Sequence, residues 1–335
     1  MRRLRLGIVG TGFGLYGLLP AFYSLKNCEV VSICGHKNER LLKFCKGINL
    51  NNIYEDWQDM LAQEQLDAIA IAVPPTIQYE IASVAIRKGL HIFAEKPLTA
   101  TLLQARELYK LAVKNKITSA VDFIFPEIDE WRKIKELLDS KKYGKLNYIA
   151  VNWDFLSYDI KHKKSSWKTD VGEGGGALSF FFSHVLYYLE YFAGEISDVS
   201  SQFSHSVEST NGGEVGIDLL LTFKKGVTGY AHGKCDARGL WHHQLSFYCD
   251  KATILLRNEN SVVNNFKIEI FTAEKGKQLL TKKKPKLITD EDERVKEVRK
   301  IASRFVDACL EKKQMTPSIA HGLRVQELIE KIRRG

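Results

Sequence analysis

The sequence predicts an α/β protein with a doubly wound parallel sheet at its N-terminus, followed by an α+β domain built on a large, mostly antiparallel open sheet. Three observations predict this fold class. Over the first 122 residues, short and continuously apolar segments alternate with helical ones. Glycines at positions 10, 12 and 14 follow the first apolar segment and precede a helix. Beyond residue 196, strand-like segments follow one another directly, which is typical of hairpins and antiparallel pairing.

The first third of the chain carries the pattern of a parallel sheet covered on both faces. Strands in such a sheet are continuous apolar runs, because helices bury both of their faces. The predicted strands are residues 4–9, 29–34, 67–73, 91–94 and 118–121. The predicted helices are residues 14–26, 39–46, 77–88 and 98–114.

The pattern changes after residue 122, so we expect two domains, residues 1–122 and 123–335. The second domain should begin with a helix and a partly alternating strand. A glycine-rich turn then opens a buried helix, a series of strands follows, and two helices close the chain. These elements are expected at residues 127–140, 145–155, 172–176, 177–192, 196–271, 290–312 and 318–333.

The composition is that of an ordinary globular protein with a basic excess. The 335 residues are 44% hydrophobic and 27% charged, and the net charge is +9. The charge is spread out and comes without a zinc finger, a basic heptad region or an RNA-binding aromatic signature, so we expect no nucleic-acid partner. An anionic small-molecule substrate fits the charge better. The one dense lysine cluster, residues 275–286, is interpreted as a solvated hairpin tip.

The apolar runs and the cysteines bear on a membrane partner, a bound metal and the cellular compartment. No uncharged run is long enough to span a bilayer, so we expect no membrane partner. The six cysteines include no C-x-x-C pair and have no histidines at zinc-binding spacing, so we expect no metal. Free thiols together with the lack of a signal peptide predict a cytoplasmic protein.

The stretch Gly10-Thr11-Gly12-Phe13-Gly14 has the context of a dinucleotide-binding loop, between the first strand and the first helix. Gly10 permits a tight turn, Gly12 lets a pyrophosphate approach the backbone, and the helix N-terminus attracts the phosphates. The third glycine of G-x-G-x-x-G would fall at Leu15, so the motif is imperfect. Because strands and helices continue to alternate behind it, residues 1–122 are predicted to bind NAD(P).

The end of the second strand indicates which dinucleotide is bound. A carboxylate there would hold the adenine ribose and repel a 2′-phosphate. This chain has Gly35, His36 and Lys37, with Arg40 nearby, and these small and basic groups favour NADP(H). The alternative is that Lys37 and Arg40 are solvated residues at a helix start.

Several further segments resemble the Gfo/Idh/MocA (glucose–fructose oxidoreductase / inositol dehydrogenase) family. They are residues 7–21, Val73-Pro74-Pro75, Glu95-Lys96-Pro97, Trp167-Lys168, and the run at residues 174–178 followed by His184. The resemblance covers almost the whole chain. It implies an N-terminal Rossmann domain and a C-terminal domain for substrate binding and oligomerisation. It also implies a dehydrogenase or ketoreductase that transfers a hydride between NAD(P) and a carbon of a sugar, polyol or sugar nucleotide.

The resemblance also implies roles for individual residues. Lys96 would lie beside the nicotinamide and the reacting hydroxyl, and His184 would exchange the proton. Further cofactor-binding residues are Pro74, Pro75, Gln78 and Glu95, and substrate-binding residues are Trp167, Lys168, His184 and Tyr187. An indole can stack on a sugar ring and Lys168 can meet a phosphate, although a solvated loop is the alternative. Weaker candidates are Tyr158, His232, His242 and His243; the last two are neighbours on a strand, so they should face opposite sides.

The sequence departs from the family pattern at three positions. Many members have an Asp four residues before the histidine and another three residues after it, where this chain has Phe180 and Tyr187. Gln78 stands where members often have His. His184 would then act with Lys96 alone or with help from Tyr187 or a later histidine, or turnover is lost. The alternatives to a dehydrogenase are therefore a regulatory or partner subunit that only binds the cofactor, and a redox-neutral glycosidase or epimerase that retains NAD. An open sheet face would suit a homodimer or homotetramer.

Overall fold

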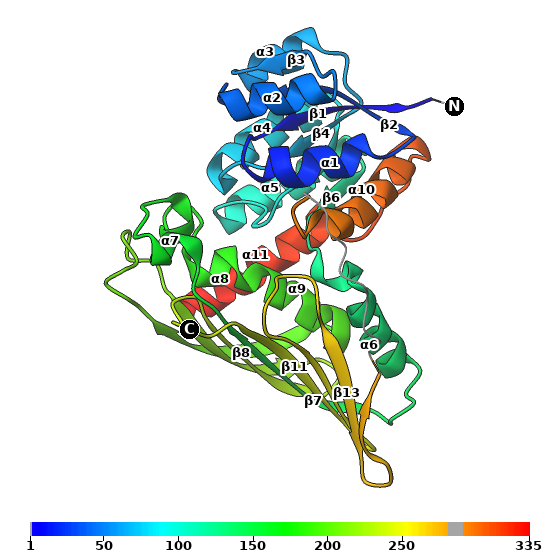
Figure 1. Cartoon of the computed structure of the whole chain (residues 1–335), viewed down its shortest axis with the longest axis vertical. Helices are drawn as coiled ribbons and strands as arrows, with labels where there is room; N and C mark the ends of the chain where they lie inside the picture. Colours follow the sequence, from blue (N-terminus) through cyan, green and yellow to red (C-terminus); the bar gives the residue numbers. More distant parts are fainter. Residues whose placement is uncertain (1, 281–290) are drawn as a thin grey trace. The chain divides into compact units, whose positions relative to one another are not determined.

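The computed structural model describes residues 2–280 and 291–335. The described residues form two compact units. The first unit comprises Met1–Ile124 and Thr289–Gln326, and the second comprises Phe125–Ile288 and Glu327–Gly335. Figure 1 labels most of the helices and several strands of both units. Within the described ranges, none of the helices combines the length and apolar character that a bilayer span requires.

The first unit contains a six-stranded parallel sheet in the order β3-β2-β1-β4-β5-β6 (Figure 1). This order confirms the predicted doubly wound sheet, and it reverses between β1 and β4, next to the glycine loop. Open α/β sheets bind their ligands at such a point. The strands are β1 Leu4–Val9, β2 Cys28–Cys34, β3 Asn52–Tyr54, β4 Ala68–Ile71, β5 His91–Ala94 and β6 Ser119–Val121.

The helices of this sheet begin where local signals place them. Pro75 occupies the first turn of α4, where proline costs no hydrogen bond. Thr101 and Gln104 form a capping box, so α5 begins at Leu102 rather than at residue 98 as predicted. β3 and α3 were not predicted, because residues 49–66 are polar and the strand is only three residues long. The helices are η1 Gly14–Leu18, α1 Leu19–Tyr23, α2 Glu39–Gly47, α3 Trp57–Gln63, α4 Pro75–Arg87 and α5 Leu102–Lys114.

A C-terminal segment completes the first unit. Helix α10, Val295–Leu310, buries Phe305 against Phe22 and Phe93, with ring centroids 6.3 and 5.7 Å apart. This packing brings Thr289–Gln326 into the first unit, so the division differs from the contiguous one at residue 122. The last helix, α11, spans Ile319–Arg334.

The second unit contains an eight-stranded sheet in the order β14-β13-β12-β11-β7-β10-β9-β8. Among the described strands β7 and β10 form its one parallel pair, so the predicted mostly antiparallel sheet is confirmed. The strands are β7 Leu146–Asp154, β8 Ile196–Ser204, β9 Gly216–Phe223, β10 Thr228–Lys234, β11 His242–Cys249, β12 Thr253–Asn258, β13 Lys267–Thr272 and β14 Gly276–Leu279. β13 and β14 form a hairpin, and residues 275–279 of the lysine cluster belong to its turn and second strand. Residues 281–286 of the cluster lie outside the described ranges.

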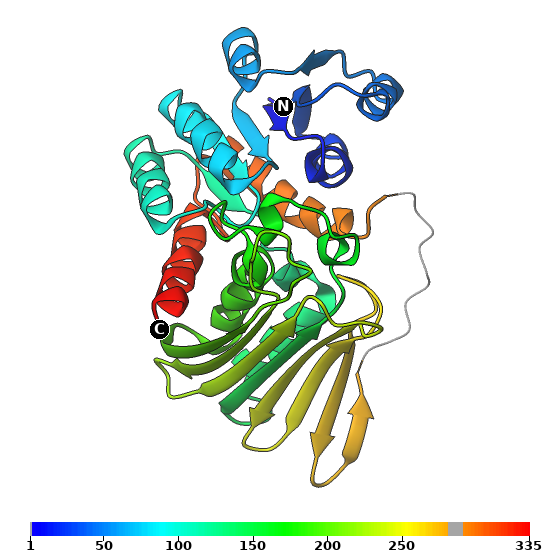
Figure 2. The same ribbon diagram turned by 90° about the vertical axis from the view of Figure 1, so that its left-hand side faces the viewer.

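Helices of the second unit cover one face of this sheet, and the other face is open (Figure 2). Side chains along each strand alternate accordingly; on β10, Ala231 is fully buried while the next side chain, His232, is 26% exposed. The helices are α6 Asp129–Asp139, α7 Tyr158–Lys161, α8 Gly176–Phe180 and α9 Phe182–Ala193, with short 3-10 turns at Phe125–Glu127 (η2) and Trp167–Thr169 (η3).

Candidate active site

The glycine loop follows β1 at the point where the strand order reverses. Gly10 has a φ of +115°, and a Cβ added to it would lie 2.2 Å from the carbonyl oxygen of Ala72. Gly12 is exposed, and an added Cβ would meet no atom within 4 Å. Gly10 is therefore required by the close approach of β1 and the end of β4. Gly12 instead leaves its backbone open to a ligand, as a pyrophosphate cradle requires.

The helix after the loop opens unusually. The Gly12 carbonyl oxygen accepts from the amides of Leu15 and Tyr16 at 3.0 and 3.4 Å, and Gly14–Leu18 then form a π-helix. A Cβ at Gly14 would make only ordinary contacts, whereas one at Gly17 would lie 2.3 Å from the ring of Phe13. The glycine that packing demands in this helix is thus Gly17, which the sequence analysis did not single out.

Arg294 adds a positive charge beside the loop. Its guanidinium lies 4.3 Å from the centroid of the Phe13 ring, a cation–π geometry. Asp292 holds it with two hydrogen bonds of 2.8 and 2.7 Å. Sequence reasoning missed Arg294 because almost the whole chain separates it from Phe13, and no local motif marks it.

The end of β2 carries the basic residues that were predicted to select the cofactor. Gly35 packs against Thr11 of the loop, since an added Cβ would lie 2.6 Å from its methyl carbon. His36 and Lys37 are exposed. Arg40 stacks on Tyr16, with its guanidinium 4.0 Å from the ring centroid.

One carboxylate lies beside these basic groups. Glu55, at the end of β3, accepts from the amide of Lys37 at 3.4 Å and lies 4.0 Å from Nδ1 of His36. The sequence analysis missed Glu55 because it did not predict β3.

The Glu95-Lys96-Pro97 loop follows β5, and the side chain of Gln78 of α4 hydrogen-bonds to its backbone. The amide nitrogen of Gln78 donates toward the carbonyl oxygens of Glu95, Pro97 and Leu98, at 2.8, 3.2 and 3.0 Å. Its Oε1 accepts from the Glu95 amide at 3.0 Å. Gln78 is fully buried, so it reaches a cofactor only through the loop that it shapes.

A second acidic residue lies next to this loop. Asp122 follows β6, and its amide donates to the carbonyl oxygen of Ala94 at 2.9 Å. Its side chain is buried beside the Glu95 carboxyl group. Burial raises the pKa of Asp122 well above its usual range and the Glu95 carboxylate raises it further, against the opposing charges of Lys96 and Arg294. The sequence signal for this contact is that two adjacent strands both end in an acid.

In the second unit, the glycine run at residues 174–176 seats helix α8. A Cβ at Gly175 would lie 2.0 Å from the carbonyl oxygen of Trp167, and one at Gly176 would lie 2.4 Å from Oε1 of Glu214. The buried Glu214 carboxylate accepts from the Leu178 amide at 3.1 Å and from Arg333 of α11 at 3.1 Å. The glycines are thus explained by two close approaches.

The sequence predicted one continuous helix through Phe180 and His184, but the two residues lie on different helices. The helix breaks at Phe181, between α8 and α9. The break lets the neighbouring rings pack in different directions: Phe180 lies edge-on to Trp167 at 5.3 Å, and Phe181 edge-on to Phe155 at 4.7 Å. Phe181 itself keeps helical dihedrals, and the His184 amide donates to the Phe181 carbonyl oxygen at 3.2 Å, so the chain continues to turn through the break.

The His184 ring lies at the margin of the aromatic core of the second unit. It is 7% exposed and packs edge-on against Phe125, with ring centroids 5.0 Å apart. Tyr187, on the same helix, is half-buried.

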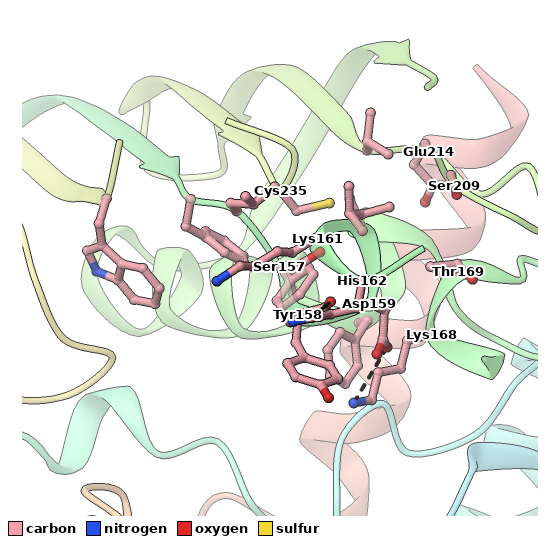
Figure 3. Close-up of a pocket in the computed structure, with 18 residues that line it drawn as sticks. Ser157, Tyr158, Asp159, Lys161, His162, Lys168, Thr169, Ser209, Glu214 and Cys235 are labelled. Carbon is pink, nitrogen blue, oxygen red and sulfur yellow. Dashed lines mark hydrogen bonds and ion pairs between the residues drawn. The ribbon is translucent and has the colours of Figure 1, made fainter. Parts of the chain in front are cut away.

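A cavity of 420 Å³ lies between the Phe155–Lys168 segment, α8 and the strand ends (Figure 3). Phe180 and Lys168 line it, and the Lys168 Nζ lies 5.1 Å from the Phe180 ring and 3.8 Å from Oδ2 of Asp159. Trp167 is not part of its lining and packs behind Phe180. The other lining residues are Leu156, Ser157, Tyr158, Ile160, Lys161, His162, Thr169, Ala177, Phe181, Ser209, Glu214, Val215, Cys235 and Trp241.

The two strand histidines face opposite sides of the sheet, as predicted, and this removes one of them as a candidate. His243 is fully buried, stacks on Trp153 at 4.6 Å, and its Nε2 lies 3.2 Å from the hydroxyl of Tyr188. Burial lowers the pKa of His243 to about 3, so it is a neutral core residue. His242 lies on the open face.

His232 also lies on the open face, between two carboxylates. Its Nε2 is 3.0 Å from Asp154 and its Nδ1 is 2.8 Å from Asp218. Hydrogen bonding to Asp154, more than to Asp218, raises the pKa of His232 to about 9. His232 is therefore a charged member of an ion-pair cluster at neutral pH.

Solved structures of this fold include two with bound nicotinamide cofactors. A levoglucosan dehydrogenase in complex with NADH and L-sorbose superimposes with a TM-score of 0.86 at 18% identity, over 100% of this chain and 96% of that one. KijD10, a 3-ketoreductase from Actinomadura kijaniata in complex with NADP and TDP-benzene, gives 0.83 at 20% identity, over 100% and 98%. At these identities the similarity establishes the fold.

Sequence relatives extend the comparison. An uncharacterized oxidoreductase of Synechocystis is 27% identical over 98% of this chain and 92% of its own length. A dTDP-3,4-didehydro-2,6-dideoxy-alpha-D-glucose 3-reductase of Actinomadura kijaniata is 26% identical over 67% of this chain and 66% of its own length.

The family models match successive parts of the chain. Residues 4–123, which contain the glycine loop and Lys96, match an oxidoreductase family with an NAD-binding Rossmann fold. Residues 131–255, which contain the cavity-lining helix α8 and His184, match the GFO/IDH/MocA C-terminal domain. With both domains matched in this order, the chain belongs to the Gfo/Idh/MocA family of oxidoreductases.

Proposed function

We propose that this protein is an NAD(P)-dependent dehydrogenase or ketoreductase whose substrate is an anionic, sugar-like molecule, phosphorylated or linked to a nucleotide. The observation that carries the proposal is the open backbone at Gly12, at the switch point of a doubly wound sheet, with Lys96 on a loop of the same sheet. The bound nicotinamide supplies the hydride acceptor or donor. Gly10 to Gly14 hold the pyrophosphate, and Pro74 and Pro75 border the cradle after β4.

The catalytic roles follow the resemblance to the family. The Lys96 ammonium stabilises negative charge on the reacting oxygen, and His184 takes or returns its proton. Imidazole is suited to this role in general, because its ordinary pKa of about 6.5 lies near neutral pH. Phe180 and Tyr187 supply no carboxylate at the two positions where many members carry one.

NADP(H) is the proposed cofactor. His36, Lys37 and Arg40 place positive charge at the end of β2, where an NAD-selective enzyme has a carboxylate. The Arg40 guanidinium lies over the Tyr16 ring, and in the proposed complex it stacks on the adenine or binds the 2′-phosphate. Glu55 opposes this preference, but it lies one strand further out and accepts from the backbone of Lys37.

The cavity beside α8 is the proposed substrate subsite. Its aromatic walls, including Phe180 and Trp241, suit the apolar face of a sugar ring, and its volume suits a small ligand. Lys161 and Lys168 supply positive charge for an anionic group. Trp167 supports this wall from behind Phe180.

The test combines cofactor binding with turnover. NADPH fluorescence should respond to the protein, and a panel of sugars, sugar phosphates and sugar nucleotides should reveal a substrate. Lys96→Met should lower kcat by 10²-fold or more while NADPH still binds, because the charge is needed at the reacting oxygen. Lys114→Met, at the exposed end of α5, is the matched control. Failure to bind either dinucleotide would refute the proposal.

Two alternatives make different predictions. Phe180 and the burial of His184 favour a cofactor-binding regulatory or partner subunit, which would bind NADPH but turn over nothing in the panel. A redox-neutral glycosidase or epimerase would keep NAD through purification and turn over without a net change in absorbance.

Assembly and location complete the proposal. A homodimer or homotetramer would cover the open sheet face, where Tyr148, Leu220 and Tyr248 are 36%, 63% and 44% exposed. All six cysteines are free thiols, five of them buried, which suits the reducing cytoplasm. Sedimentation of the wild type against Leu220→Asp tests the assembly.

A further inference from the structure

Two acidic residues directly follow the ends of two adjacent parallel strands in the first unit. β5 and β6 are paired so that Ala94 lies opposite Val121. The next residues are Glu95 and Asp122, and the Asp122 amide extends the pairing by donating to the Ala94 carbonyl oxygen at 2.9 Å. The two acids therefore end adjacent strands in register, and the backbone itself brings them together.

The contact between these carboxyl groups requires a proton. Asp122 is 2% exposed, and solvent reaches neither its Oδ1 nor the Oε1 of Glu95. No donor among the described residues hydrogen-bonds to either of these oxygens, yet the two side chains lie within hydrogen-bonding distance of each other. Ionised carboxylates are acceptors only, and two of them in contact repel strongly out of water. One shared proton turns this repulsion into a hydrogen bond.

The charged groups around the pair are consistent with a single negative charge. Lys96 and Arg294 are the cations that act on Asp122, and Glu95 is the anion. Arg294 is already neutralised by its two hydrogen bonds to Asp292. A pair with one proton therefore carries one negative charge, on which Lys96 acts as a cation.

The remaining oxygen of Glu95 connects the pair to the lysine. Glu95 Oε2 accepts from the backbone amide of Lys96 at 3.1 Å. A protonated Asp122 that donates to the other side of the carboxylate fixes the Glu95 side chain in this orientation. Gln78 holds the Glu95 backbone from behind, so the loop that carries Lys96 is restrained on two sides.

We propose that Asp122 and Glu95 share one proton, and that this monoanionic pair holds Lys96 in position. Asp122 is a positioning residue that acts on Lys96 through Glu95. The part of the inference that concerns catalysis rests on the proposed function, because that function assigns Lys96 to the reacting oxygen. The shared proton itself does not depend on it.

The proton is tested on the protein without substrate. With ¹³C-labelled aspartate, the carboxyl resonance that disappears in Asp122→Asn belongs to Asp122. We expect this resonance to stay at the position of a neutral acid at pH 7, where the exposed aspartates have already titrated. A resonance that titrates together with the exposed aspartates would overturn the proposal.

The positioning role is tested by comparing two variants. Asp122→Asn keeps a donor toward Glu95, so its kcat at pH 7 should remain within about threefold of wild type. Asp122→Ala has no donor and should lower kcat about tenfold or more, with the KM for the cofactor little changed. Asp122→Asn should also remove any alkaline limb of the pH–rate profile that arises when the pair loses its proton. Equal kcat values and pH profiles for Asp122→Ala and wild type would refute the positioning role.

A control and a second measurement keep the result interpretable. Glu297→Gln removes another buried carboxylate of the first unit, which is 3% exposed and lies 2.8 Å from Lys300. It should leave the pH profile unchanged. If the protein proves to have no turnover, ¹⁵N-labelled lysine still reports on Lys96: its side-chain signal should move in Asp122→Ala and remain in place in Asp122→Asn. If the side-chain resonance of Lys96 is unchanged in both variants, the positioning role is refuted without any assay of activity.

Discussion

Replacing Asp122 by Asn should change how the stability of this protein depends on pH. Asp122 keeps its proton in the folded protein, because burial and the neighbouring Glu95 raise its pKa well above the ordinary value of 3.8. In the unfolded chain the same side chain ionises at its ordinary value. Between these two pKa values, the folded protein therefore holds one proton more than the unfolded chain.

The sign and size of the effect follow from this difference. The stabilising hydrogen bond of the protonated Asp122 contributes fully below pH 3.8, and this contribution is lost as the pH rises through the folded-state pKa. Within the window the free energy of unfolding falls by about 1.4 kcal/mol for each pH unit. Asn cannot titrate, so the wild-type advantage over Asp122→Asn should shrink at this same rate as the pH rises through the window.

Urea denaturation of both proteins at several pH values measures this slope. Titrating groups remote from the pair contribute equally to the two proteins and cancel in the difference. Glu297→Gln, in the same unit, is the control for the general loss of a buried carboxylate. Parallel stability curves for wild type and Asp122→Asn over this range would refute the assignment of a proton to Asp122.

Three further predictions concern the cradle, the cofactor and the core. Gly12→Ala should leave the melting temperature unchanged but weaken NADPH binding at least tenfold. Gly10→Ala should destabilise the fold by about 3 kcal/mol or more, because its added methyl, unlike that at position 12, meets backbone atoms. Calorimetry measures the stability and fluorescence titration the binding, and equal effects of the two variants would contradict the assigned roles. Lys37→Glu should raise the Kd for NADPH about tenfold or more with little effect on NADH, and an unchanged preference would show that Lys37 is a solvated residue. His243→Phe should flatten the acid side of the stability profile: with a folded-state pKa of about 3 against 6.5 unfolded, neutral His243 contributes stability that is lost as the pH falls through this window, at about 1.4 kcal/mol per pH unit. An equally steep acid limb in the variant, measured by urea denaturation, would contradict the burial of a neutral imidazole.

Much of the fold could be predicted because its signals are local. The mainly apolar runs of β1, β4 and β5 identify a buried parallel sheet, and turn signals between strands identify the antiparallel one. Prediction failed where the local signal was weak or long-range packing dominated. The three-residue strand β3 has no apolar run, and the break at Phe181 is set by where its ring and its neighbours pack.

The sequence by itself determined the family, the glycine cradle and the two residues proposed for catalysis, Lys96 and His184, because each belongs to a contiguous motif whose context is local. Only the tertiary structure placed Asp122 against Glu95, Arg294 over Phe13, and His243 in the core. These contacts join residues that are distant in the chain. A proton shared between two acids, or a histidine kept neutral, arises from what surrounds a side chain, and strand register and packing decide those surroundings.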